Sequence, residues 1–213
     1  MPRGVLIVFE GAEGVGKSTQ LRRLALWLEA RGRVVHALRE PGGTPVGDQI
    51  RHLLLDPASD IAPRAEALLF MASRAQLVEQ FVRPALNAGH VVLLDRFFLS
   101  TYAYQGAGRG LPEAEIRQAN AVATGGLVPD LTLLLTLPVA EGLRRAEARG
   151  ARDRMERNAD EFHHRVADAF TAFAQPAWQD AHRECGPIVV VDAAGSEDEV
   201  FSRVRAEAER ALA

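Results

Sequence analysis

Residues 11–18 read Gly11-Ala12-Glu13-Gly14-Val15-Gly16-Lys17-Ser18 and fit the pattern G-x-x-x-x-G-K-[ST] in full. A short apolar segment, 5–9, precedes them, and a segment with helical periodicity, 18–30, follows, which is the strand–loop–helix context that the pattern requires. Glycines let successive backbone N–H groups turn inward around an anion, and the dipole of the next helix strengthens their attraction for it. The sequence therefore predicts a loop that binds the phosphates of a nucleoside triphosphate.

Two side chains of this loop are expected to act on the phosphates. Lys17 is the only lysine among 25 basic residues, and its compact ammonium suits the β- and γ-phosphates. The hydroxyl of Ser18 is expected to ligate Mg²⁺. The full set expected to bind the nucleotide is Gly11, Ala12, Glu13, Gly14, Val15, Gly16, Lys17, Ser18 and Thr19.

Apolar segments alternate with helical ones along the rest of the chain. Strands are predicted over 5–9, 34–38, 91–94, 131–137 and 188–191, and helices over 18–30, 46–55, 63–88, 112–124, 139–149, 160–184 and 197–212. Uniformly apolar strands alternating with helices predict an α/β fold, with a five-stranded parallel sheet and helices on both faces. No repeat or linker divides the sequence, so residues 1–213 are expected to form a single domain.

Composition excludes several classes of protein. A net charge of −3 disfavours a basic nucleic-acid module, and no apolar run approaches the roughly 20 residues that span a bilayer. The single cysteine, Cys185, cannot form an intramolecular disulfide, and the apolar segment at 5–9 is too short for a signal peptide. The expectation is a cytoplasmic protein that acts on small molecules and binds neither nucleic acid nor a membrane.

A second acidic group is expected beside the phosphate loop. Asp95 directly follows the apolar segment 91–94, at the point where a neighbouring strand would end. A carboxylate there is expected to contact Mg²⁺ through water. A cap for the following helix is the alternative role.

The lysine count also narrows the class of nucleotide-binding protein. Guanine recognition by N-K-x-D is impossible when the only lysine lies in the phosphate loop, and the transporter signature L-S-G-G-Q is absent. The remaining class is a small nucleotide kinase, in which an arginine-rich lid closes over the phosphates of two small molecules.

Further motifs carry a more specific resemblance. They are Arg39-Glu40-Pro41-Gly42-Gly43-Thr44, Phe70-Met71-Ala72-Ser73-Arg74, Asp95-Arg96-Phe97-Phe98-Leu99-Ser100-Thr101-Tyr102-Ala103-Tyr104-Gln105-Gly106 and Arg149-Gly150-Ala151-Arg152-Asp153-Arg154. With them the chain resembles the bacterial thymidylate kinase family over nearly its whole length. The resemblance implies a P-loop nucleotide kinase fold, a homodimer packed through helices near the acceptor site, and phosphorylation of dTMP to dTDP by ATP and Mg²⁺ in dTTP synthesis.

The resemblance also implies an acceptor site. Arg96 is expected to clamp the 5′-phosphate, for which a bidentate guanidinium is suited. Phe70 and Arg74 share a helix face at i, i+4; by resemblance, Phe70 stacks on thymine and Arg74 donates to its O4, a contact that discriminates against the amino group of cytosine.

The remaining acceptor residues follow the same resemblance. Thr101 and Gln105 are expected near the base edge, Tyr104 under the sugar, and Glu13 at the 3′-hydroxyl. Ser100, Glu40 and Pro41 complete the expected substrate-binding set. The family often has a cis peptide at Glu40–Pro41, which the sequence leaves open.

The lid is expected over about 149–157. One version of the family has an arginine in the phosphate loop, whereas the other has a small residue there and catalytic arginines in the lid. Gly14 indicates the second version, with Lys17, Arg96, Arg149, Arg152 and Arg154 as the expected catalytic set. Which lid arginine faces the transferring phosphate stays open.

Two other functions remain as alternatives. A deoxynucleoside kinase would need a carboxylate base, for which Glu13 or Glu40 is available, whereas the dianionic phosphate of dTMP needs none. A non-catalytic nucleotide-binding protein could keep the phosphate loop alone. The base of the donor is unassigned, with Asp192–Ala193 as a candidate region.

Overall fold

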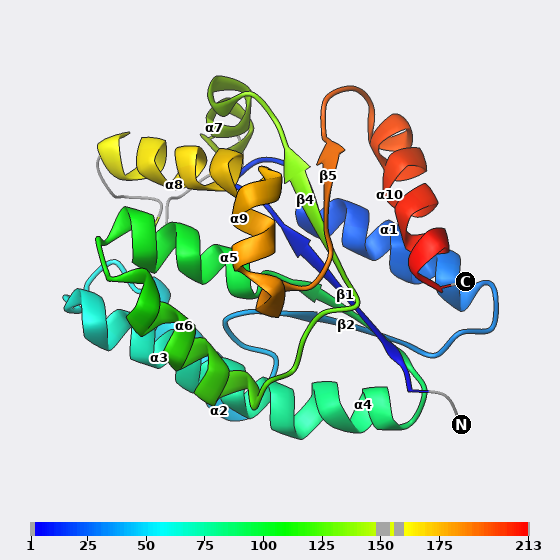
Figure 1. The fold of residues 1–213 in the computed structure, drawn as a ribbon, viewed down its shortest axis with the longest axis horizontal. Helices are drawn as coiled ribbons and strands as arrows, with labels where there is room; N and C mark the ends of the chain where they lie inside the picture. Colours follow the sequence, from blue (N-terminus) through cyan, green and yellow to red (C-terminus); the bar gives the residue numbers. More distant parts are fainter. Residues whose placement is uncertain (1–2, 148–153, 156–159, 213) are drawn as a thin grey trace.

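The protein is built around one parallel β-sheet (Figure 1). This computed structural model describes residues 3–147, 154–155 and 160–212. The strands run in the order β2-β3-β1-β4-β5. Their bounds are β1 (Val5–Glu10), β2 (Val35–Arg39), β3 (Val91–Asp95), β4 (Leu131–Thr136) and β5 (Ile188–Asp192). The predicted five-stranded parallel sheet is confirmed, and every strand bound agrees to within one residue.

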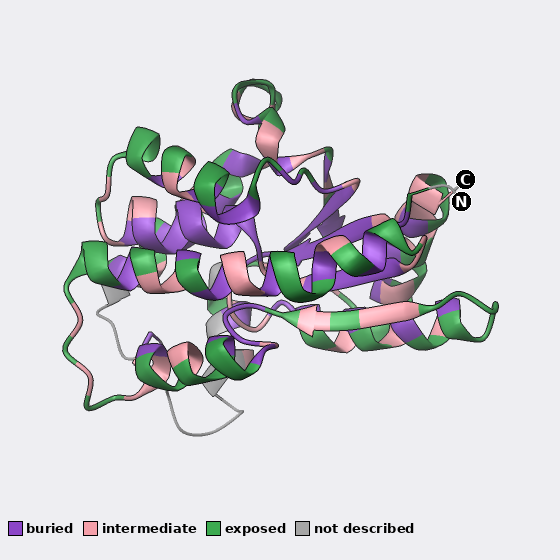
Figure 2. Cartoon of the chain, turned by 90° about the horizontal axis from the view of Figure 1, so that it is seen from below, coloured by how far each residue is buried: buried purple, intermediate pink, exposed green. Residues whose placement is uncertain are grey.

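Helices cover both faces of the sheet, which explains why the central strands β1, β3 and β4 are mostly apolar, whereas the edge strand β2 has no buried residue. In β1, Ile7 and Phe9 pack with α1 (Lys17–Glu29) and α10 (Glu197–Leu212), whereas Leu6 and Val8 face the opposite core. Successive side chains point to opposite faces, so each strand contributes to both cores. Figure 2 shows the central strands and the inward helix faces as buried, whereas the edge strand β2 and the outward helix faces are intermediate or exposed.

The second face carries the longer helical segments. α3 (Pro63–Leu77) continues through the π-helical segment η1 (Val78–Val82) into α4 (Arg83–Asn87), so the helix predicted over 63–88 is one run. The other elements are α2 (Pro45–Leu55), α5 (Phe98–Thr101), η2 (Tyr102–Gly108), α6 (Glu113–Thr124), α7 (Val139–Glu147), α8 (Asp160–Phe173), α9 (Pro176–Ala181) and η3 (Arg183–Cys185).

One helix prediction was wrong, and one helical run was missing from the predicted elements. The helix predicted over 160–184 breaks after Phe173, and α9 starts at Pro176, because proline lacks an N–H and disfavours helical backbone before it. The helical run of α5 and η2 was not predicted, since glycines at 106 and 108 weaken helix propensity. Tertiary contacts described below hold that run instead.

The chain segments that follow β1, β2, β3 and β5 meet at one edge of the sheet. β1 lies at the centre of the sheet. The next strands along the chain, β2 and β3, lie on one side of β1, and β4 and β5 lie on the other, so the strand order reverses at β1. Crevices outside the carboxyl ends of parallel strands, where the strand order reverses, are the usual ligand sites of such folds. Among the described residues, no helix has both the length and the apolar character to cross a membrane.

Candidate active site

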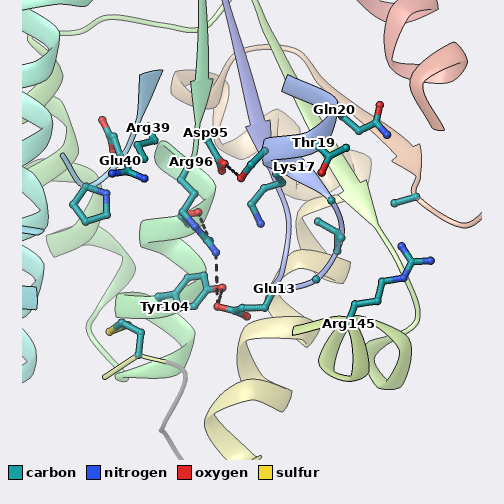
Figure 3. Close-up of a pocket in the computed structure, with 18 of the residues that line it drawn as sticks. Glu13, Lys17, Thr19, Gln20, Arg39, Glu40, Asp95, Arg96, Tyr104 and Arg145 are labelled. Carbon is teal, nitrogen blue, oxygen red and sulfur yellow. Dashed lines mark hydrogen bonds and ion pairs between the residues drawn. The ribbon is translucent and has the colours of Figure 1, made fainter. Parts of the chain in front are cut away.

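A cavity of about 480 Å³ opens at this edge of the sheet (Figure 3). Most of the predicted site residues line it. From the donor set these are Glu13, Gly14, Val15, Gly16, Lys17, Ser18 and Thr19; from the acceptor and metal sets they are Glu40, Pro41, Phe70, Arg74, Asp95, Arg96, Ser100, Thr101, Tyr104 and Gln105. We call the wall formed by 13–20 the donor half and the wall formed by 39–41, 70–74 and 96–105 the acceptor half.

Glycines of the phosphate loop allow close packing as well as left-handed backbone. Gly14 has φ +76°, and a Cβ there would lie 2.0 Å from the carbonyl oxygen of Gly142 in α7. A Cβ at Gly11 would lie 2.3 Å from the carbonyl oxygen of Leu135. Gly11 and Gly14 therefore let the loop pack closely against its surroundings. Gly11 and Ala12, unlike the residues after them, do not line the cavity.

Lys17 lies folded against its own loop. Its Nζ donates to the carbonyl oxygens of Gly11 and Ala12, each at 2.8 Å, and the side chain is almost fully buried. Burial, reinforced by the positive charge of Arg96, lowers the pKa of Lys17 to about 8. A bound polyphosphate would restore the charged form, because an anion nearby stabilises the ammonium.

Ser18 and Asp95 meet across the cavity floor. The Ser18 hydroxyl donates to Asp95 Oδ2 at 2.5 Å, joining the start of α1 to the end of β3. Within the described part of the chain, no group of three or more His, Cys, Asp or Glu side chains could hold a metal ion. Mg²⁺ keeps several waters and takes only one or two protein ligands beside substrate phosphates, so these two oxygen donors fit it.

Arg96 occupies a strained backbone conformation at the centre of the site. Its φ of +73° is left-handed, which costs a non-glycine residue of order 1–3 kcal/mol. Nη1 donates to Ser100 Oγ at 3.1 Å, and the guanidinium lies 5.0 Å from the centre of the Tyr104 ring. Burial by itself would lower the pKa of Arg96, but Tyr104, Glu13 and the other nearby carboxylates raise it above its ordinary value.

Glu10, to which sequence reasoning gave no role, explains how this strained turn is held. Its carboxylate is fully buried and accepts from the backbone N–H groups of Phe97 and Ser100, at 2.7 and 3.1 Å, and from Ser100 Oγ at 2.7 Å. These bonds satisfy orphan donors at the start of α5, as an N-cap does. The sequence did carry a signal for this residue, since Glu10 is a carboxylate directly at the end of an apolar strand.

Glu13 and Tyr104 link the two halves of the cavity. The Tyr104 hydroxyl donates to Glu13 Oε1, and Arg96 Nη2 lies 3.7 Å from the same oxygen (Figure 3). Burial by itself would raise the pKa of Glu13, but Arg96, Tyr104 and Lys17 outweigh it and lower the pKa. Glu13 is therefore an ionised acceptor, suited to a ligand hydroxyl.

Arg74 is almost fully buried, and all three of its guanidinium nitrogens have protein partners. Nε and Nη2 lie 2.7 and 2.6 Å from Glu40 Oε2, and Nη2 also donates to the Phe97 carbonyl at 2.8 Å. Nη1 donates to Thr101 Oγ1 at 2.9 Å and to Asn120. The hydrogen bond to thymine O4 that the sequence predicts would therefore replace one of these contacts.

The other predicted acceptor residues surround this arginine. Phe70 lies one turn before it on α3, half-buried on the cavity wall. Gln105 is buried and donates through Nε2 to Glu66 at 3.0 Å. The Glu40–Pro41 peptide is cis, the conformation that the resemblance allowed. Burial raises the pKa of Glu40 despite its contact with Arg74.

Predicted lid arginines are only partly described. Arg149 and Arg152 lie outside the described residues. Arg154 is described, but it does not line the cavity: its Nη2 contacts Glu66 at 2.6 Å and its Nε donates to the Leu54 carbonyl at 2.7 Å. Arg145 of α7, which precedes the expected lid and was not among the predicted site residues, does line the cavity (Figure 3).

Other cavity-lining residues were not predicted from the sequence. Arg39 at the end of β2 and Arg51 of α2 add positive charge to the acceptor side. Beyond the phosphate loop, Gln20, Ala193, Gly195, Glu197 and Val200 line the cavity. Ala193 belongs to the candidate region for the donor base.

The chain is similar to known proteins over most of its length. A family model described as Thymidylate kinase matches residues 9–204. The thymidylate kinase of Deinococcus radiodurans is 48% identical over 204 residues, which cover 96% of each chain. The thymidylate kinase of Clavibacter michiganensis subsp. michiganensis is 46% identical over 211 residues, covering 99% of this chain and 97% of that one. The thymidylate kinase of Thermosynechococcus vestitus is 50% identical over 190 residues, covering 83% of this chain and 79% of that one.

Proposed function

Since the chain belongs to the thymidylate kinase family, it phosphorylates dTMP to dTDP, and we propose that the cavity described above holds both substrates of this reaction. The α/β architecture is the P-loop kinase fold of that family, and ATP is the phosphoryl donor. The donor half would bind ATP and the acceptor half dTMP.

The donor half would act through backbone and charge. N–H groups of the phosphate loop and Lys17 would hold the β- and γ-phosphates, and Arg145 would approach them from α7. Ser18 and Asp95 would hold Mg²⁺, which, when bound, neutralises charge on the phosphates. Gln20, Ala193 and Gly195 line the part of the cavity left for the nucleoside.

The acceptor half would bind dTMP at three points. Arg96 would clamp the 5′-phosphate, with Arg39 and Arg51 adding positive charge. Tyr104 would lie beneath the sugar, and its partner Glu13, which reaches across from the donor half, would accept from the 3′-hydroxyl. Phe70 would stack on the base, with Arg74, Thr101 and Gln105 at its edge.

Transfer then needs no general base, because the attacking phosphate is already an anion. Catalysis rests on holding two anions in line and on stabilising charge on the transferring group. A nucleoside kinase would need a free carboxylate base. The lowered pKa of Glu13 makes it a weak base, and Glu40, although burial raises its pKa, is not free because Arg74 holds its carboxylate.

The observation that supports this proposal most is one continuous cavity that reaches from Lys17 to Phe70. The test is ADP formation from ATP and Mg²⁺ with dTMP, dUMP, dCMP, AMP, GMP, thymidine or no acceptor. We expect fast turnover with dTMP, slower turnover with dUMP, and little with the others. Preference for thymidine, or silence with every acceptor, would overturn the assignment of the acceptor half.

We further propose that the enzyme is a cytoplasmic homodimer. Helices beside the acceptor half expose large apolar side chains: Leu68 of α3 is 64% exposed and Val122 of α6 is 85% exposed. Such side chains on neighbouring helices suit a subunit contact. Light scattering should give twice the chain mass, and Val122→Glu should give the monomer; a monomeric wild type would contradict the dimer. Cys185 is a free, buried thiol, consistent with a reducing compartment.

A further inference from the structure

Behind the acceptor half lies a buried carboxylate to which the sequence analysis assigned no role. Glu66 of α3 is fully buried, one helical turn before Phe70 and two before Arg74. Oε1 accepts from Gln105 Nε2 at 3.0 Å and from Arg109 Nε at 3.1 Å. Oε2 accepts from Arg109 Nη2 at 3.0 Å and from Arg154 Nη2 at 2.6 Å. One carboxylate thus joins three segments that lie far apart in the sequence.

These contacts keep Glu66 ionised. Burial by itself would raise its pKa, but hydrogen bonds from Arg109, Gln105 and Arg154 outweigh burial and lower it. An ionised carboxylate can only accept hydrogen bonds, so the atom that Gln105 turns toward Glu66 must be the amide nitrogen. The orientation of the Gln105 amide, which often has two choices, is therefore fixed.

A fixed amide has a consequence for the base. Gln105 lines the cavity, and because Nε2 is turned toward Glu66, the carbonyl oxygen, which is the acceptor of the amide, points away from Glu66 and can meet an N–H of a ligand. Thymine and uracil carry an N3–H that can donate to such an oxygen. Cytosine has a lone pair at N3, which would face the oxygen without a hydrogen.

The Glu66 carboxylate also holds, through Arg154, a second segment that lines the cavity. The backbone N–H of Arg154 donates to the Leu55 carbonyl at 3.1 Å, and its Nε donates to the Leu54 carbonyl. These are carbonyls of the last turn of α2, where a cation is favoured. The next residue, Met155, lines the cavity.

We propose that Glu66 is a positioning residue for the pyrimidine: it fixes the Gln105 amide with its oxygen toward N3–H and, through Arg154, holds Met155 against the acceptor half. The inference rests on the proposed function, because it assigns the base to this half of the cavity. It also gives Arg154 a role on the acceptor side in place of the catalytic role that the sequence predicts.

The first test is Glu66→Gln, with kcat and KM measured for dTMP, dCMP and ATP. A glutamine at 66 can donate, so Gln105 is free to reverse its amide. We expect KM for dTMP to rise about tenfold and the preference for dTMP over dCMP to fall about tenfold. KM for ATP should change less than twofold. Unchanged base preference in folded E66Q would overturn the proposal.

A merely structural role for Glu66 predicts lower stability without a change in preference. We therefore repeat the substitution in Gln105→Ala, where there is no amide to orient. E66Q should then change the preference by less than twofold. An undiminished change in that background would contradict action through Gln105.

If E66Q fails to fold, Arg154→Met is the second test of the proposal. This variant leaves the buried Glu66 carboxylate paired with Arg109, so no buried charge is left without a partner. We expect a rise of about threefold or more in KM for dTMP with KM for ATP unchanged. A rise in KM for ATP or a fall in kcat, with KM for dTMP unchanged, would place Arg154 at the donor phosphates and overturn the proposal.

The matched control is Glu79→Gln, which removes a carboxylate from the same helical run. Glu79 is exposed and paired with Arg83, outside the cavity. Its kinetic constants should equal those of the wild type. Failure of the proposed function would show as absence of dTMP turnover in the wild type, a result separate from any change in these variants.

Discussion

The two halves of the cavity are built in different ways. The donor half is one continuous segment, whose geometry comes from glycine backbone and whose lysine is held by main-chain carbonyls. The acceptor half is assembled from segments that follow β2 and β3 and from α3. There the buried carboxylates Glu10, Glu40 and Glu66 each hold cavity-lining groups in place. Substitutions should therefore act on one substrate at a time, and the predictions below test that separation.

The largest effect is expected for Lys17→Met. Removing the ammonium from the phosphates should lower kcat by ~10³-fold or more. Lys17→Arg should also fail, because a guanidinium is larger than the pocket that the loop forms around Nζ. A variant that retains most of its activity would contradict the phosphate-loop assignment.

The same variant makes a prediction about stability and pH. The pKa of Lys17 is about 8 in the folded protein and 10.5 in its ordinary state, so folding disfavours the charged form. Between these two values the unfolded chain binds more protons, and wild-type stability gains with rising pH. The Tm of K17M relative to wild type should therefore be highest below pH 8 and fall toward pH 10. A constant difference would show that the ammonium is not buried in this way.

Arg96→Ala should come next, with kcat/KM for dTMP lowered by about 10²- to 10³-fold and KM for ATP changed far less. Arg96→Gly should be equally inactive but more stable, because glycine relieves the left-handed strain of roughly 1 kcal/mol. That difference corresponds to about 2–4 °C in Tm for a chain of this size. Equal Tm values would contradict the strain, and normal kinetics would remove Arg96 from the acceptor site.

Asp95→Asn tests the metal-binding pair. We expect kcat to fall by about 10²-fold and the Mg²⁺ concentration needed for half-maximal rate to rise, since an amide is a weaker ligand for a hard cation. Asp180→Asn, on the surface beside Arg183, is the matched control. An unchanged Mg²⁺ dependence in D95N would remove Asp95 from the metal site.

The smallest effect is expected for Phe70→Leu. The loss of stacking should raise KM for dTMP about tenfold, because base–aromatic stacking contributes ~1–3 kcal/mol. KM for ATP should stay constant. Equal changes in both constants would mean that Phe70 supports the fold of the cavity as a whole.

The same contrast between the two halves explains which parts of the fold and of the site could be predicted from the sequence. The phosphate loop and the five strands follow from local patterns, so Lys17 and the path of β3 to Asp95 were predictable. Glu10 and Glu66 act through contacts 87 to 90 and 39 to 88 residues away, which no local period reports. The α5–η2 run was not predicted either, because its glycines weaken helix propensity and the carboxylate that caps it, Glu10, lies far away in the sequence at the end of β1. Arg154 was predicted as a lid arginine, yet its described position depends on a contact with Glu66, which the sequence does not report.

The most direct test of the two-half cavity is inhibition by a single molecule in which a chain of phosphates joins the 5′ positions of adenosine and thymidine. If one continuous cavity holds both substrates with their phosphates facing each other, this compound should compete with ATP and also with dTMP. Competition with only one of them, while the other still binds the inhibited enzyme, would contradict the account.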